Sequence, residues 1–387
     1  MSTPSGLSAL LPASIKGRIL LFVVCFEITA YGTIVLFNNY VYKNALIEQK
    51  SNEIKQTFTA SVGKINHARQ LMERNVIDLA NFGEHLYQIK QTANLSLKTI
   101  GVAAEQTLVR NFSEFEQAIG GGIWYEPYLL DKQTRYFGPY AYREGKEVLF
   151  SWDLNTPEYD YLNQDWYTIA TVNEKVANKI AKGSASGQRI FWTEPYYDQA
   201  ATFSLMMTVD GLMFDHADQH IGMATVDWSM AQLTTFIDSV KVSDNAWPFL
   251  IYQGEGKFLS FPKDKSRVLQ GAEQFDWGQK ILADQRQDAL FVLPNWQIDN
   301  QLYNIYYFRT PAGFVFGSLM PLSDFNRSIS TITTITLLAG GGIGSAFIVL
   351  MVLWLRRLFS PFDEVLQRIQ KSITRLPDDK HTVVITP

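Results

Sequence analysis

The sequence predicts an α+β protein in which one long helix leads into two small antiparallel-sheet modules, with a membrane-spanning helix at each end of the whole. Three observations predict this architecture. Two apolar runs, residues 19–37 and 329–355, are each long enough to cross a hydrocarbon core of roughly 30 Å as a helix. Residues 40–119 have the periodicity of a helix, and residues 120–328 alternate short β-rich runs with turn signals.

Basic residues beside the two apolar runs predict how the chain crosses a bilayer. They precede the first run and follow the second, and positively charged residues favour the cytoplasmic side of a membrane. We therefore expect residues 1–18 and 356–387 in the cytoplasm, with residues 38–328 outside it. The basic residues concerned are Lys16, Arg18, Arg356, Arg357 and Arg368.

Each apolar run has a competing interpretation. The first is interpreted as a retained anchor, because it is too long for a usual signal peptide and no A-x-A cleavage pattern follows it. The second contains Gly340 and Gly344, which superficially resemble part of a glycine-rich phosphate loop. Inside a membrane span, their spacing instead predicts a small-residue face for close helix packing.

The long helix predicted over residues 40–119 carries one apolar face. Apolar or small residues recur there at steps of three or four, which is typical of a helix that packs along one side. Burial against the protein's own domain explains this face, and a dimer-forming surface is the alternative. The face consists of Ile54, Phe58, Val62, Ile65, Ala68, Met72, Val76, Leu79, Phe82, Leu86, Ile89, Ala93, Leu97 and Ile100.

Two modules are predicted after this helix. The first spans residues 120–240 and begins at a run of three glycines, after which short strands alternate with helical spacing at residues 161–181 and 230–240. The second spans residues 241–328 and repeats the pattern of strands with a covering helix. Because the second module leads into the second apolar run, we expect the first module to lie farther from the membrane.

The segment after the second run is predicted to contain one more helix. Pro361 is well placed to begin it, and apolar residues form a stripe along it. The stripe consists of Phe362, Val365, Leu366, Ile369 and Ile373.

Composition and cysteine usage restrict the possible functions. A net charge of −4 and a pI near 5.8 give no basic face, so nucleic acid is not an expected partner. The single cysteine, Cys25, lies in the first apolar run, so the exterior segment has no disulfide framework. We expect no cofactor and no enzyme activity in this chain, because no nucleophile or metal site with an orienting partner is apparent there.

Short motifs in this order resemble double Cache sensor domains of bacterial transmembrane receptors, in which a long helix leads into two PAS-like modules. Residues 165–170 (DWYTIA), 192–198 (WTEPYYD) and 222–227 (GMATVD) are similar to motifs of the first module. Residues 254–262 (GEGKFLSFP) are similar to a hairpin of the second, and residues 358–372 resemble the first helix of a HAMP relay.

The resemblance implies a ligand site in the first module. Receptors of this family that bind amino acids use a Tyr, an Arg, a Trp-Tyr pair, a second Tyr and an Asp. The Arg position is occupied here by Gln164, and a neutral amide cannot replace the bidentate guanidinium that binds a carboxylate. The positions that match the motif are Tyr159, Gln164, Trp166, Tyr167, Tyr196 and Asp227.

Aromatic residues with one carboxylate suit a cation, so we expect a small amine or another small polar molecule rather than an α-amino acid. The chain is then a signalling receptor of the bacterial inner membrane, expected to be a homodimer with both termini cytoplasmic. Alternatives are the input portion of a histidine kinase, diguanylate cyclase or serine phosphatase, with the catalytic domain beyond residue 387, or a module that binds a periplasmic protein.

One acidic and histidine-rich string has residues that could bind a metal ion. Residues 215–220 (DHADQH) place four potential metal-binding side chains, Asp215, His216, Asp218 and His220, within six positions. The strands predicted on both sides favour a solvated hairpin tip, so no metal is expected there.

Overall fold

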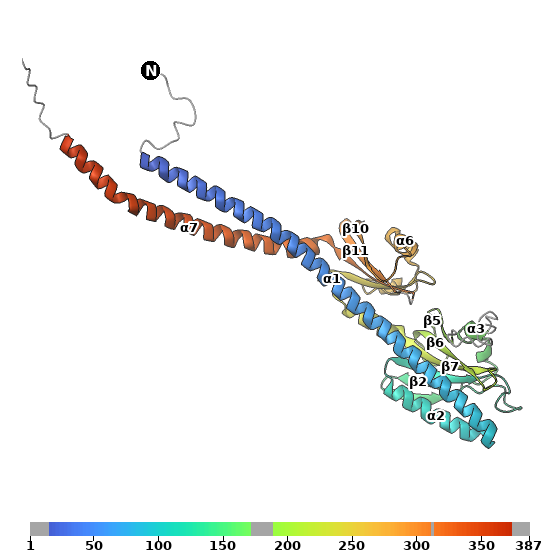
Figure 1. Ribbon diagram of the computed structural model, residues 1–387. Helices are drawn as coiled ribbons and strands as arrows, with labels where there is room; N and C mark the ends of the chain where they lie inside the picture. Colours follow the sequence, from blue (N-terminus) through green and yellow to red (C-terminus); the bar gives the residue numbers. More distant parts are fainter. Residues whose placement is uncertain (1–14, 172–188, 311–312, 374–387) are drawn as a thin grey trace, which may run out of the picture. The chain divides into compact units, whose positions relative to one another are not determined.

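The structure is a computed structural model that describes residues 15–171, 189–310 and 313–373 (Figure 1). The chain divides into two compact units. The sheet unit contains residues 52–325, and the helical unit contains residues 1–51 together with residues 326–387. The ends of the predicted cytoplasmic segments and the predicted helical residues 172–181 lie outside the described residues.

The first module of the sheet unit, residues 118–239, is built on an antiparallel sheet of seven strands. Two helices, α3 (Asp165–Thr171) and α5 (Met230–Ser239), belong to it, and a short 3-10 helix precedes α3. In spatial order the strands are β3 (Glu147–Ser151), β2 (Tyr140–Glu144), β1 (Ala118–Tyr125), β7 (His220–Ser229), β6 (Leu205–Phe214) and β4 (Ile190–Trp192), with β5 (Tyr196–Tyr197) also paired to β6.

The second module, residues 247–321, contains an antiparallel sheet of five strands with helix α6 (Asp276–Ala283). In spatial order the strands are β10 (Leu290–Ile298), β11 (Gln301–Arg309), β12 (Phe314–Pro321), β8 (Trp247–Tyr252) and β9 (Lys257–Ser260). Short 3-10 turns at Lys265–Arg267 and Ala272–Gln274 connect β9 to α6. The predicted α+β class with two successive sheet modules is therefore confirmed.

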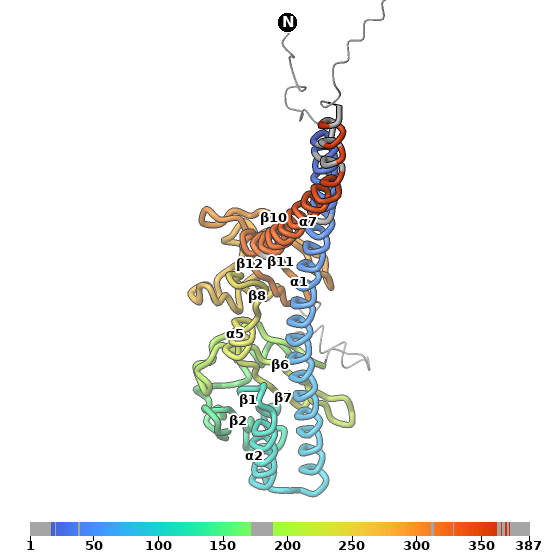
Figure 2. The backbone as a smooth tube through the Cα atoms, turned by 90° about the vertical axis from the view of Figure 1, so that its left-hand side faces the viewer, coloured from blue at the N-terminus to red at the C-terminus, as the bar shows by residue number. Residues whose placement is uncertain are grey.

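The prediction of one continuous helix over residues 40–119 is wrong. Helix α1 (Ile15–Ala93) ends before Asn94, which takes a left-handed conformation with φ of 45°, and α2 (Leu97–Glu114) begins after it. Ser96 caps α2, since its hydroxyl accepts the Thr99 amide at 3.1 Å. Figure 2 shows that α2 runs back beside α1. The missed signal was the Asn-Leu-Ser break, because the apolar spacing continues through it unchanged.

Helix α1 packs on one face of the first module's sheet. The predicted apolar face is buried or partly buried from Ile54 to Leu86, in one cluster with sheet residues such as Val209 and Val226. Its first part reaches the second module, because the ring of Phe58 lies 4.9 Å from that of Phe316. The contact is close where α1 crosses β6, because a Cβ atom at Gly211 would lie 3.1 Å from the Val76 carbonyl oxygen. This face is therefore used within the protomer, and the dimer alternative is not needed to explain it.

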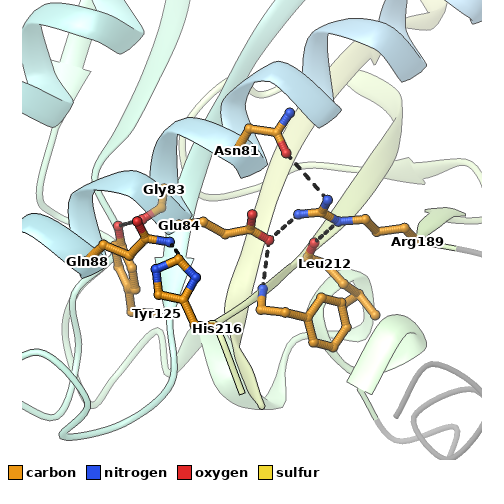
Figure 3. A network of polar contacts seen from close by, with 9 residues as sticks. Asn81, Gly83, Glu84, Gln88, Tyr125, Arg189, Leu212 and His216 are labelled. Atoms are coloured by element: carbon orange, nitrogen blue, oxygen red, sulfur yellow. Dashed lines mark hydrogen bonds and ion pairs between the residues drawn. The ribbon is translucent and has the colours of Figure 1, made fainter. Parts of the chain in front are cut away.

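Polar contacts fix α1 to the edge of the same sheet (Figure 3). Glu84 of α1 pairs with Arg189, which precedes β4, and also accepts the Phe214 amide at 2.8 Å. Arg189 in turn donates to the Leu212 carbonyl at 2.7 Å. Further along α1, Glu73 accepts the Trp192 indole N–H at 2.9 Å. Strand β4 is thus attached to α1 at two points.

Two further local expectations were wrong. The three glycines at residues 120–122 do not precede the first strand, since they lie within β1, where side chains from β2 and α2 approach closely. Pro361 does not begin a helix, because α7 (Leu322–Ile373) continues through it. A long helix accommodates an internal proline by losing one backbone hydrogen bond.

The helical unit contains the two apolar runs. Among the described residues, the helical segments Gly17–Ala93 and Leu322–Pro361 are the two that are long and apolar enough to cross a membrane. Their contact uses the predicted small-residue face: Tyr31 of α1 donates to the Gly340 carbonyl, and its ring covers Gly344. A side chain at Gly344 would occupy the position of that ring.

Candidate ligand site

The candidate site lies on the face of the seven-stranded sheet opposite α1. Successive side chains of a strand point to alternate faces, so Thr208 and Asp210 of β6 share a face. The register places Thr208 opposite Asp227 and Asp210 opposite Thr225 on β7. Two threonines and two carboxyls thus alternate at the corners of a four-residue square on two central strands.

Asp227 is the buried carboxyl of this site, with 3% of its surface exposed. The Tyr140 hydroxyl donates to Oδ2 at 2.8 Å, and the Thr208 hydroxyl donates to Oδ1 at 2.7 Å. The Tyr196 hydroxyl lies 2.7 Å from the Thr208 hydroxyl, and it donates there because Thr208 has already given its proton to Asp227. Burial raises the pKa of Asp227 to about 6, although both hydrogen bonds act to lower it.

Aromatic rings surround this carboxyl. The rings of Trp124 and Trp166 lie 4.8 Å apart between centroids, and Tyr140 packs on Trp124 at 5.9 Å. The Trp166 indole donates to the Tyr159 hydroxyl at 3.3 Å. Burial raises the pKa of Tyr159 to about 12, so this phenol is neutral. The walls are therefore apolar faces with hydroxyl groups at their edges.

Two neighbouring spaces adjoin these residues. An inner cavity of about 20 Å³ has room for roughly one water molecule. An open cleft of about 1040 Å³ lies outside it, and Tyr159, Trp166, Tyr196 and Asp198 line both. Since Glu255 of the second module also lines the cleft, the cleft reaches the junction of the two modules.

The structure places four of the six predicted site residues around the inner cavity, namely Tyr159, Trp166, Tyr196 and Asp227. Gln164 lines only the outer cleft, and its amide donates to the Tyr159 carbonyl oxygen at 2.6 Å. Tyr167 lines neither space. Its hydroxyl donates to Glu126 at 2.8 Å, so it anchors α3 to the sheet.

Residues that the sequence did not single out complete the lining. Trp124, Tyr140, Thr208 and Thr225 come from four different strands, and only the sheet register brings them together. Asp198 was part of a recognised motif but was not chosen. Its carboxylate accepts the backbone amides of Ala200, Ala201 and Thr202, which holds the loop before β6.

The charged side chains among the described lining residues are acidic, and Lys257 pairs with one of them, Glu255, at 2.6 Å. Acidic side chains line both spaces, and no described residue that lines either of them is a lysine, arginine or histidine. Such a site favours a cation and disfavours an anion. The acidic residues are Asp165, Glu194, Asp198, Asp227 and Glu255.

The predicted hairpin at residues 215–220 joins β6 to β7. Asp215 accepts the backbone amides of Ala217 and Gln219 at 2.9 and 2.8 Å, so its carboxylate holds the turn. His216 lies near Gln88 of α1 (Figure 3). Among the described residues, no group of three or more potential metal-binding side chains is arranged to hold an ion.

The first module has a recognisable sequence family. The family model described as the first PDC sensor domain of methyl-accepting chemotaxis protein-like proteins matches residues 104–235. Among curated proteins, none matches the sequence significantly.

The fold is shared with solved sensor domains at low sequence identity. The extracellular domain of mmHK1S-Z2, which is assigned as a histidine kinase, is 18% identical with a TM-score of 0.52, over 74% of this chain and 99% of that one. Methyl-accepting chemotaxis protein X is 16% identical with a TM-score of 0.50, over 74% of this chain and 99% of that one. The periplasmic sensory domain of the Campylobacter jejuni chemoreceptor Tlp1 is 11% identical with a TM-score of 0.52, over 72% of this chain and 98% of that one.

These likenesses are to sensor domains and not to catalytic domains. They agree with the order of elements, in which a long helix precedes two sheet modules. The chain therefore has the fold of a Cache-type, PAS-like sensor domain, and residues 104–235 match the family model of methyl-accepting chemotaxis protein-like first PDC sensor domains.

Proposed function

We propose that the protein is a transmembrane receptor that binds a small cationic amine in its first module and relays a conformational change across the membrane. The charge of the site carries this proposal. Asp227 is buried next to a cavity with room for about one water molecule, and the cleft outside it is acidic. An ammonium group is close to water in size and needs a counter-charge.

Aromatic side chains support the choice of an ammonium ligand. The faces of Trp124 and Trp166 and the ring of Tyr196 adjoin the cavity, and ring faces attract cations when both are out of water. A carboxylate on the ligand has no comparable partner, because Gln164 stands at the position of the family's arginine and already donates to Tyr159. An amine, or failing that another small polar molecule, fits better than an α-amino acid.

The two apolar helical segments support the membrane part of the proposal. Large apolar side chains are exposed along both, including Phe22 at 73% and Leu338 at 71%, and a bilayer would cover them. We assign residues 19–37 and 329–355 as spans with both termini in the cytoplasm, by the distribution of basic residues. The first module then lies distal to the membrane and the second proximal.

Two receptor classes are candidates for the signal that the protein passes to the cytoplasm. Residues 356–387 are proposed to begin a HAMP relay, and relay helices need a second copy against which to move, so we propose a homodimer. A chemoreceptor is the leading assignment because the matched family is of that type. The likeness to a histidine-kinase sensor makes the input portion of a kinase the second candidate.

Calorimetric titration of the full chain in lipid nanodiscs tests the ligand class. We expect saturable binding by at least one primary amine from a panel that runs from methylamine to benzylamine. The same panel as N-acetyl derivatives, which carry no charge, is the control and should not bind. Tight binding of an L-amino acid that depends on its carboxylate, with no amine binding, contradicts the proposal.

A further inference from the structure

Asp210 is the polar group in the first module that the site description leaves unexplained. Its side chain is fully buried, and neither carboxyl oxygen has a hydrogen-bond partner among the described residues. It points to the same face as Thr208 and Asp227 and pairs in register with Phe191 on β4 and Thr225 on β7. A buried polar group without a partner is costly and requires a physical explanation.

The protonation state of Asp210 follows from its surroundings. Burial raises its pKa well above the usual value, and the nearby charge of Asp227 raises it further. No basic side chain lines the adjoining cavity among the described residues. Asp210 therefore holds a proton, and Asp227 carries the negative charge of the pair. The other titratable groups that face the pair are Tyr140 of β2, Tyr159, Tyr196 of β5 and Asp198.

We propose that Asp210 is a second ligand-binding carboxyl, which remains protonated and offers its carbonyl oxygen to the ammonium group that Asp227 neutralises. This inference rests on the proposed function and names the acceptor set of the same site. It accounts for the unpartnered carbonyl oxygen of Asp210, because the ligand supplies the missing donor. It also makes Asp210 a determinant of specificity for groups that carry N–H donors.

The geometry of the two strands allows one ammonium group to reach both carboxyls. Asp210 and Asp227 occupy diagonal corners of the four-residue square, and such positions lie about 7 Å apart in an antiparallel pair. Asp210 itself does not line the inner cavity, but three residues around it on the same face of the sheet, Thr208, Thr225 and Asp227, do. The rest of the ligand would lie in the outer cleft.

Charge balance supports a protonated Asp210 in the bound state. One ammonium and one carboxylate are neutral together, whereas a second carboxylate would leave a net charge in a buried site. The inner site therefore selects a single ammonium group. A primary ammonium has three N–H donors, so it can donate to Asp210 as well as to Asp227, and no further counter-ion is needed.

Two variants of the full chain separate the acceptor role from a charge role. Asp210→Asn keeps a carbonyl oxygen without a charge, and Asp210→Val removes the acceptor while suiting a strand. With the tightest-binding primary amine of the panel as probe, we expect Asp210→Asn to bind within about twofold of wild type. Asp210→Val should bind at least tenfold more weakly. The exposed Asp238→Asn on α5 is the matched control and should bind like wild type.

A measurement without ligand tests the protonation directly. Above about pH 4 the unfolded Asp210 is ionised while the folded group keeps its proton, so wild type loses stability as pH rises. Relative to Asp210→Asn, the folding equilibrium constant of wild type should fall as pH rises above about 4, by up to about tenfold per pH unit while the folded carboxyl keeps its proton. Urea titrations followed by tryptophan fluorescence give this constant and also show whether both variants fold.

Each outcome decides the inference. Equal amine binding by wild type and Asp210→Val overturns it, and so does a loss in Asp210→Asn as large as in Asp210→Val. Identical pH slopes for wild type and Asp210→Asn overturn the protonated state. If no amine binds to wild type, the proposed function fails and this inference fails with it, whereas the other negative results leave the proposed function standing.

Discussion

The two sheet modules of the same chain differ in what fills the face that carries their covering helices. In the first module, tyrosine hydroxyls and indole N–H groups surround Asp227, and a cavity remains beside them. In the second, the corresponding face is packed with phenyl rings, and Phe258 lies between 5.3 and 6.2 Å from the rings of Phe249, Phe261, Phe275 and Trp277. Phenols and carboxyls need polar partners, whereas phenyl rings satisfy one another.

This difference teaches that a shared architecture does not imply a shared role. We assign ligand binding to the first module and a mainly structural role to the second, because aromatic rings fill the core of the second module. The following predictions test that division, from the largest expected effect to the smallest.

Truncation of Phe258 should affect stability and not binding. The side chain is fully buried in the second module, so Phe258→Ala should destabilise the protein by about 3–5 kcal/mol, as core truncations of this kind do. Urea titration measures this, and Val292→Ala at an exposed position of β10 should change stability by less than about 0.5 kcal/mol. A large loss of amine affinity in folded Phe258→Ala would contradict the division.

Neutralisation of Asp227 should have the opposite pattern. Asp227→Asn removes the counter-charge of a buried ammonium, so the amine should bind on the order of 100-fold more weakly, a loss of about 3 kcal/mol. Stability should change little, because the burial of a charge is no longer required, which offsets the hydrogen bond that the amide nitrogen cannot accept from Tyr140 or Thr208. Calorimetry is the measurement and Asp238→Asn the matched control. Unchanged affinity in Asp227→Asn would place the ligand elsewhere.

The pH dependence of wild type follows from the raised pKa of Asp227. Only the ionised carboxylate binds a cation, so amine affinity should fall about tenfold per pH unit below pH 6. Stability without ligand should move the other way. The folded pKa is above the unfolded value, so the protonated form stabilises the fold and this contribution is lost as pH rises from about 4 to 6. Parallel slopes for affinity and stability would refute the assignment.

The smallest expected effect concerns the aromatic wall. Trp166→Leu removes a ring face beside the cavity, and the amine should bind about fivefold more weakly, a loss of about 1 kcal/mol. Trp152→Leu, at a partly exposed tryptophan outside both spaces, is the control. Equal effects of the two substitutions on affinity would show that the ring acts through packing alone.

Periodicity in the sequence was enough for the fold class and the order of elements. The alternation of strands and the apolar face from Ile54 to Leu86 both correspond to the structure. The turn at Asn94 was missed because helical spacing continues on both sides of it, and a left-handed residue leaves no mark on that spacing. The prediction at Pro361 was wrong because proline is common at the start of a helix and disfavoured inside one, yet α7 continues through it.

The candidate site was only partly accessible from the sequence. Motif similarity pointed to Tyr196 and Asp227, which do adjoin the cavity, and also to Tyr167, which points to Glu126 instead. Asp210 lies in a strand with apolar residues on both sides of it, so nothing local distinguishes it. Its relation to Asp227 depends on the register between β6 and β7, which a single sequence does not encode in any readable pattern.

The double attachment of β4 to α1 has a mechanical consequence. Glu73 and Glu84 lie about 16 Å apart along the helix axis, so the strand cannot pivot about one contact without breaking the other. Phe191, between these attachments, pairs in register with Asp210. A displacement of that strand by an arriving amine would therefore act on three turns of α1 together and not on a single contact point.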